Sequence, residues 1–61
     1  MKRTNLIRHL QRHNCIFVRE GGSHTIYKNL TNNKMTSIPR HREIKENLAR
    51  KICDDLDVPR P

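Results

Sequence analysis

The residue of this chain best suited to chemistry is His24, which follows two glycines and a serine. An imidazole with its ordinary pKa of about 6.5 can give and take protons near neutral pH. RNA carries its own nucleophile, the 2′-hydroxyl group, so one general base or one general acid suffices for slow cleavage. Such help is worth about 10²- to 10⁴-fold in rate. His24 is therefore a candidate catalytic residue for metal-independent cleavage of RNA.

The residues around His24 are of the types that hold a phosphate group. Glycine lets another backbone approach closely, and backbone N–H groups in the turn before His24 can face phosphate oxygens. Basic side chains can stabilise the charge that develops in the transition state. We predict RNA contacts for Gly22, Ser23, Lys28, Arg40, His41 and Arg42. His41 is alternatively a second proton carrier, and His24 is alternatively an ordinary surface residue beside a turn.

The composition favours a polyanionic partner. The chain of 61 residues has 13 Lys and Arg against 6 Asp and Glu, a formal net charge of +7. Such an excess attracts nucleic acid, an anionic membrane surface or an acidic protein. No stretch approaches the roughly 20 apolar residues of a spanning helix, and no apolar export segment follows the basic N-terminus. We therefore expect a cytoplasmic protein that makes no use of a membrane.

Cysteine and histidine spacing gives no sign of a metal site. Cys15 and Cys53 lie in separate apolar segments, which in a cytosolic chain favours reduced core residues over a disulfide. His9 and His13 are four residues apart on a predicted helix, a spacing that can hold a metal ion. No third ligand is evident, and the flanking arginines disfavour a cation. We predict no metal and no other cofactor.

A small α+β domain must position His24. A chain this short has room for one core layer. Apolar spacing and turn signals predict helices at Thr4–Asn14 and Lys45–Leu56, and strands at Cys15–Glu20, Ser23–Asn29 and Lys34–Ile38. Each helix has one apolar face, so we expect both to pack on one face of a three-stranded antiparallel sheet. We expect one domain over residues 1–61, with an irregular tail at 58–61.

The glycine pair predicts a tight hairpin. Gly21 and Gly22 suit the two central positions of a turn in which both residues have positive φ. That turn would pair Arg19 with His24. The face of His24 would then also hold Phe17, Ile26 and Lys28. Both faces carry apolar residues, so the sequence leaves the core face open, and a bulge at the glycines would invert the assignment.

Tyr27 lies on the other face of the predicted second strand. An aromatic ring there can stack on a base or fill the core.

The order of these features resembles the HicA (YcfA-like) toxins of bacterial toxin–antitoxin pairs. The residues that carry the likeness are Gly22-Ser23-His24, Ile26-Tyr27-Lys28, Val18-Arg19 and Ile38-Pro39-Arg40-His41. With the flanking helices, the likeness covers nearly the whole chain. Two segments depart from the family pattern, Asn47-Leu48 at the opening of the last helix and the Val58–Pro61 end.

The resemblance implies a double-stranded-RNA-binding-domain-like fold of order α-β-β-β-α. It further implies the toxin of a type II toxin–antitoxin system, a ribosome-independent endoribonuclease that cleaves mRNA with His24 as its single catalytic histidine. The implied partner is a HicB-type antitoxin that covers the active site.

A non-catalytic, basic RNA-binding module of the same fold is the rival hypothesis, because it would have the same charge and shape. A basic adaptor that binds only proteins is a third. Growth inhibition that disappears with His24→Ala would favour the toxin.

Overall fold

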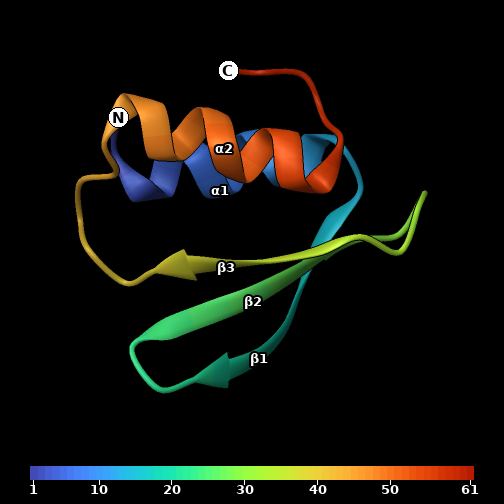
Figure 1. The fold of residues 1–61 in the computed structure, drawn as a ribbon, viewed down its shortest axis with the longest axis horizontal. Coiled ribbons are helices and arrows are strands. Elements are labelled where there is room, and N and C mark those ends of the chain that lie inside the picture. Colours follow the sequence, from blue (N-terminus) through green and yellow to red (C-terminus); the bar gives the residue numbers. More distant parts are fainter.

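A computed structural model describes residues 1–61. The elements are, in chain order, α1 (Arg3–Arg12), β1 (Cys15–Gly21), β2 (His24–Asn29), β3 (Met35–Pro39) and α2 (Glu46–Leu56). The strands form an antiparallel meander in the spatial order β1-β2-β3. Both helices lie on one face of the sheet and leave the other face open (Figure 1). The predicted α-β-β-β-α fold is confirmed, with element ends shifted by one or two residues.

The hydrophobic core lies between the helices and the sheet. Leu6 and Leu10 of α1 are fully buried, since their four-residue spacing puts them on one face of the helix. The buried face of α2 consists of Ala49, Ile52, Cys53 and Leu56. Tyr27 is only 7 % exposed and packs in this cluster, so it is a core residue and no stacking platform for a base.

Both cysteines are free thiols buried in the core. Their predicted place in the core is thus confirmed. Burial raises the pKa of the Cys15 thiol, and burial is also the main cause of the raised pKa of Cys53. Because the thiolate is the reactive form, these core thiols are poor nucleophiles.

The turn of the first hairpin lies one residue later than predicted. Gly22 and Ser23 form it, while Gly21 ends β1 as the Cα partner of His24. Of the two glycines only Gly22 has a positive φ, 56°. The predicted pairing of Arg19 with His24 is wrong, because Arg19 lies two residues before Gly21 on β1 and pairs with Ile26.

A bulge in β1 changes the register beyond the turn. The pairing shifts between Phe17 and Arg19, which leaves Val18 without a partner in β2. Phe17 consequently pairs with Tyr27, and their rings meet edge to face at 6.3 Å between centroids. The predicted placement of Phe17 on the face of His24 is therefore wrong.

The structure decides which face of β2 is the core face. Thr25, Tyr27 and Asn29 are buried beneath the helices. The alternate residues, His24, Ile26 and Lys28, point to the open face. His24 therefore faces away from the helices.

The start of α1 is held by the segment after β3. Lys2 takes the N-cap position of α1, and no side chain caps the helix. An isolated bridge pairs Lys2 with Glu43, and the Arg3 N–H donates to the Arg42 carbonyl at 2.9 Å. These bonds bring the first residues of the chain beside residues 40–43.

The opposite end of the sheet is closed by asparagine side chains. Asn29, 3 % exposed, donates from Nδ2 to the Leu56 carbonyl at 2.8 Å, and Asn32 donates to the same carbonyl at 3.1 Å. The three non-glycine residues with positive φ, namely Asn14, Asn33 and Asp57, all flank this end. Neither helix of the fold has the length and hydropathy needed to cross a lipid bilayer.

Candidate active site at the hairpin end

His24 is the first residue of β2 and lies exposed at the edge of the open face. Its Cα partners are Gly21 on β1 and Pro39 on β3, so it occupies the central strand with a neighbour on each side. The Ser23 hydroxyl lies 3.4 Å from His24 Nδ1. The ring is thus held beside the turn, on a sheet face that no helix covers (Figure 1).

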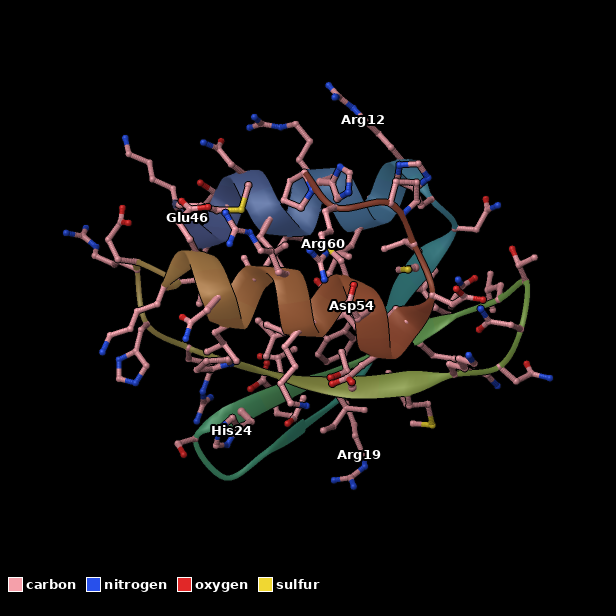
Figure 2. The ribbon with its side chains drawn as sticks, turned by 45° about the horizontal axis from the view of Figure 1, so that its top comes forward. Arg12, Arg19, His24, Glu46, Asp54 and Arg60 are labelled. Carbon is pink, nitrogen blue, oxygen red and sulfur yellow. The ribbon has the colours of Figure 1, made fainter.

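Arg19 joins His24 on this face. It is two residues before Gly21 on β1, and alternate strand residues share a face. A Cβ atom built on Gly21 would lie 3.1 Å from Arg19 Nη1, so the guanidinium lies over Gly21. Figure 2 shows Arg19 projecting from the side of the sheet that faces away from the helices. Sequence reasoning did not include Arg19 among the site residues, although strand alternation was a signal that could have found it.

On the helix side, a chain of polar contacts fastens the hairpin tip. Arg3 Nη2 donates to the Thr25 hydroxyl at 3.0 Å, and that hydroxyl donates to Glu20 Oε1 at 3.2 Å. Arg40 Nη1 donates to Glu20 Oε2 at 2.9 Å, while Arg40 Nη2 donates to the Gly22 carbonyl. Thr25 is only 2 % exposed, so these contacts satisfy a hydroxyl that water does not reach.

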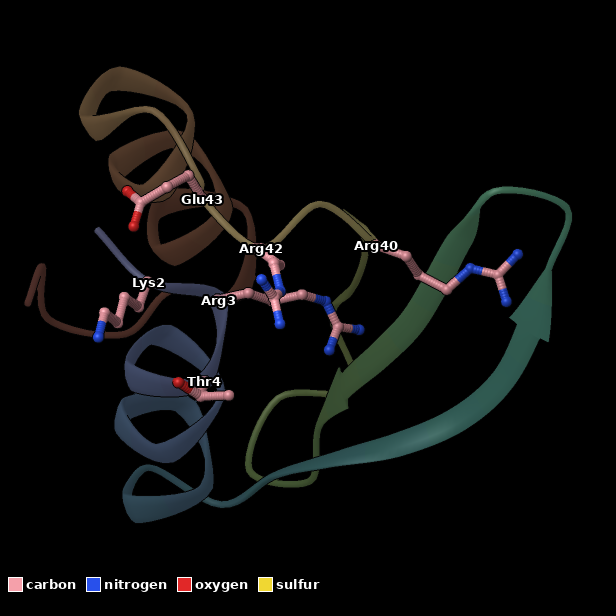
Figure 3. A pocket seen from close by; sticks show the side chains of 6 residues that line it. All are labelled: Lys2, Arg3, Thr4, Arg40, Arg42 and Glu43. Carbon is pink, nitrogen blue, oxygen red and sulfur yellow. The ribbon is translucent and has the colours of Figure 1, made fainter.

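Two of the predicted RNA-binding residues turn to the helix side instead of the open face. Arg40 is engaged with Glu20 and the Gly22 carbonyl, so the protein itself uses much of its hydrogen-bonding capacity. Arg42 lines a hollow of about 670 Å³ (Figure 3). The hollow, called the basic hollow below, is lined by Lys2, Arg3, Thr4, Arg40, Arg42 and Glu43. None of these residues is hydrophobic.

The other predicted contacts lie at different distances from His24. Lys28 shares its strand and face but is four residues away, about 13 Å at the rise of a β-strand. His41 is exposed in the loop after β3, two residues beyond Pro39, the Cα partner of His24. Gly22 and Ser23 form the turn itself. The structure therefore brings Gly22 and Ser23 next to His24 and spreads the basic residues around it.

The histidine pair on α1 is engaged elsewhere. The rings of His9 and His13 meet at 4.8 Å between centroids, and His9 Nε2 lies 2.6 Å from the Pro59 carbonyl. No group of three or more His, Cys, Asp or Glu side chains is placed so that it could hold a metal ion. His9 thus holds the tail that follows Val58 against α1, and His13 packs on the His9 ring.

The hairpin end thus offers one proton carrier and one adjacent guanidinium on an open face, with further cations around the rim. A phosphodiester is the substrate class that this chemistry fits, because it needs proton transfer and charge neutralisation at one phosphorus atom.

Comparison with known proteins gives one match. A family model described as HicA toxin of bacterial toxin-antitoxin matches residues 3–58. The matched range spans both helices and all three strands. No curated protein and no solved structure matches the chain.

Proposed function

This chain belongs to the HicA toxin family of bacterial toxin–antitoxin systems, and from that premise we propose that it is an endoribonuclease that cleaves mRNA without ribosome or metal. The observation that carries the proposal is the position of His24, exposed at the hairpin end on the uncovered face of the sheet. A proton carrier with no covering element can meet a long RNA strand. A buried histidine could not.

In the proposed reaction the 2′-oxygen of RNA attacks the adjacent phosphorus. The bond from the 2′-oxygen to phosphorus forms, and the bond from phosphorus to the 5′-oxygen breaks. The 2′-hydroxyl proton leaves with a base, and the 5′-oxygen receives a proton from an acid. His24 serves one of these two transfers, and water serves the other unless His41 reaches the same phosphate.

The RNA strand is held around the hairpin end. The backbone of Gly22 and Ser23 lies next to His24 and supports the scissile phosphate. Lys28 contacts the strand further along the open face, and Arg42, His41 and the free donors of Arg40 contact it where it passes the rim. These positions are those at which a backbone phosphate would meet a cation, and such contacts give affinity without sequence preference.

The partner of this toxin is, by its family, a HicB-type antitoxin. We propose that the antitoxin covers the open face at His24 and so excludes RNA. A net charge of +7 favours an acidic surface on that partner. The proposed place of action is the cytoplasm, where mRNA and antitoxin are both present.

The test is cleavage of a long RNA in EDTA by the wild type, by His24→Ala and by His13→Ala as a matched control on α1. We expect fragments with the wild type and with His13→Ala, and a loss of at least about 10²-fold in rate with His24→Ala. His24 is exposed, so the variant should melt like the wild type. Equal cleavage by all three proteins would refute the role of His24.

The rival function is a non-catalytic RNA-binding module, which the exposed basic groups would serve equally well. It predicts that a native gel shows RNA shifted by both wild type and His24→Ala, with no fragments from either. Growth of a bacterial host that expresses each protein gives an independent reading, because only a nuclease loses its toxicity with the histidine.

A further inference from the structure

We infer that Arg19 is a second catalytic residue, whose guanidinium binds the non-bridging oxygens of the phosphate at which His24 transfers a proton. The inference rests on the proposed function and deepens it. Its evidence is independent of the family match, because it comes from the register of the first hairpin and from the space above one glycine.

The register puts the two groups side by side. Gly21 is the Cα partner of His24, and the Cβ positions of such a pair are about 5 Å apart. Arg19 Nη1 lies 3.1 Å from the Cβ position of Gly21. The guanidinium therefore lies over the residue directly opposite His24, on the same open face.

A glycine is needed at each of the two hairpin positions for a different physical reason. Gly22 has a φ of +56° and nothing within 4 Å of its Cβ position, so it is needed for its backbone conformation. Gly21 has no positive φ, and its Cβ position is crowded by Arg19 alone. A methyl group at position 21 would move the guanidinium by a few tenths of an ångström, and a longer side chain would move it further. Gly21 thus provides the room in which Arg19 lies beside His24.

Arg19 is also free to bind a ligand. Arg3 donates to the Pro39 carbonyl and to Thr25, and Arg40 donates to Glu20 and to Gly22. Arg19 is exposed, and its side chain has neither a carboxylate partner nor a hydrogen bond within the protein. Arg42 is equally unpaired but lines the basic hollow on the helix side. Arg19 is therefore the unengaged arginine on the face of His24.

The chemistry needs such a group. When the 2′-oxygen adds to phosphorus, negative charge accumulates on the two non-bridging oxygens. A guanidinium presents paired N–H donors that match two oxygens of a phosphate. A donor that acts on charge developing in the transition state is worth about 10²- to 10³-fold in rate where solvent is excluded, and we expect the lower end on an open face.

The experiment compares three variants at saturating RNA in EDTA. Arg19→Gln should lower the cleavage rate about 10²-fold with little change in the concentration for half-maximal rate. Arg19→Lys should recover part of the rate, since lysine keeps the positive charge but lacks the paired N–H donors of the guanidinium. Arg12→Gln is the matched control, with the same loss of charge at an exposed position on α1 away from the open face (Figure 2), and should leave the saturated rate unchanged.

A double-mutant cycle tests the role of Gly21. Gly21→Ala should lower the rate severalfold in the wild-type background, because its methyl group displaces the guanidinium. It should have no further effect in the Arg19→Gln background. An equal loss in both backgrounds, or an Arg19→Gln variant that keeps the saturated rate as Arg12→Gln does, would overturn the inference. Thermal melts should show all five variants folded, the double variant included, since every substituted side chain is exposed or absent.

A titration without cleavage separates this inference from the proposed function. A 2′,3′-cyclic nucleotide is added to labelled protein, and the NMR signals of the Arg19 Nε–H group and the His24 ring are followed. We expect both to shift together, and the His24 shift to be much reduced in Arg19→Gln. If the wild type cleaves nothing yet the signals shift together, the anion site stands and the nuclease function fails. If the wild type cleaves and Arg19 does not shift, the inference fails.

Discussion

The two ends of the sheet use polar residues in opposite ways. At the asparagine end, defined by Asn29, Asn32 and the Leu56 carbonyl, side-chain amides are turned inward and close the C-terminus of α2. At the hairpin end, His24 and Arg19 point outward on the open face and bond to no buried group. One end therefore contributes stability, and the other keeps its functional groups available.

The left-handed residues show the same division. Asn14, Asn33 and Asp57, at the asparagine end, adopt positive φ with side chains that tolerate that region. The hairpin end uses glycine, Gly22, for its one positive φ. A turn of glycine and serine leaves the backbone N–H groups uncovered, which suits a phosphate. The comparison teaches that the two faces of the hairpin end differ: its helix side, like the asparagine end, is held by side-chain hydrogen bonds, whereas on its open face the Arg19 side chain has none.

Asn29→Ala tests the stability of the asparagine end and should have the largest effect. It removes the bond from Nδ2 to the Leu56 carbonyl and the bond from the Thr31 N–H to Oδ1, both 2.8 Å. We expect a loss of about 2–3 kcal/mol in unfolding free energy. A chain of this size has only about 3–9 kcal/mol in total, so the melting temperature should fall by about 10–20 °C.

The control for Asn29 is Asn5→Ala, an exposed asparagine on α1 that accepts one bond from Arg8. Circular dichroism melts should place it within about 0.5 kcal/mol of the wild type. Equal shifts for the two variants would show that burial of Asn29 is not what holds that end.

Gly22→Ala tests the left-handed position at the hairpin end. Its Cβ has open space, so the cost is the backbone strain of alanine at positive φ, about 1 kcal/mol. Gly22→Asn should cost less, because asparagine tolerates this region, as it does at Asn14 and Asn33. Urea unfolding curves with an unchanged m-value give the free energy of unfolding of both variants. A Gly22→Asn variant less stable than Gly22→Ala would contradict the explanation.

Glu20→Gln tests the contacts that fasten the hairpin tip. The Glu20–Arg40 pair is half exposed on both sides, so its loss should cost under about 1 kcal/mol. Removal of the carboxylate also frees Arg40 and takes one negative charge from the rim. RNA affinity, read by fluorescence anisotropy with an uncleavable 2′-O-methyl strand, should rise up to about fivefold. Unchanged or weaker affinity would show that Arg40 does not meet RNA.

Arg60→Ala should have the smallest effect. Arg60 lies in the tail and donates to Asp54 on α2 at 2.9 and 3.2 Å (Figure 2). These bonds hold the pKa of Asp54 below its ordinary value. Because the folded-state pKa is lowered, the pair contributes stability above the ordinary pKa of about 3.8 and loses it as pH falls through the lowered value.

The measurement for Arg60→Ala is an NMR titration of the Asp54 carboxyl carbon with melts at neutral and acidic pH. The titration midpoint should return toward the ordinary value, and the neutral-pH melt should not change measurably, since both groups are exposed. A clear fall in the neutral-pH melting temperature would contradict this prediction and show that the tail stabilises the fold.

Sequence reasoning succeeded where the apolar pattern was regular. The apolar spacing that predicted the second helix is that of Ala49, Ile52, Cys53 and Leu56, which are all in the core. The left-handed conformations of Asn14 and Asn33 agree with the tolerance of asparagine for that region. Sequence reasoning failed to predict the register of β1, where Ile16, Phe17 and Val18 are 44 %, 51 % and 39 % exposed. Three exposed apolar residues in a row give no alternation, so the bulge at Val18 had no signal in the pattern.

The sequence by itself determined the order of elements, the strong positive charge and the choice of His24 as the group able to move a proton. These depend on residue type and on spacing within one segment. The tertiary structure alone decided that His24 faces the open side, that Arg19 lies over Gly21, and that Arg40 turns toward Glu20. The Arg3–Thr25 and Arg40–Glu20 contacts join residues 22 and 20 positions apart. Contacts over such separations are set by packing and register, which no local pattern encodes.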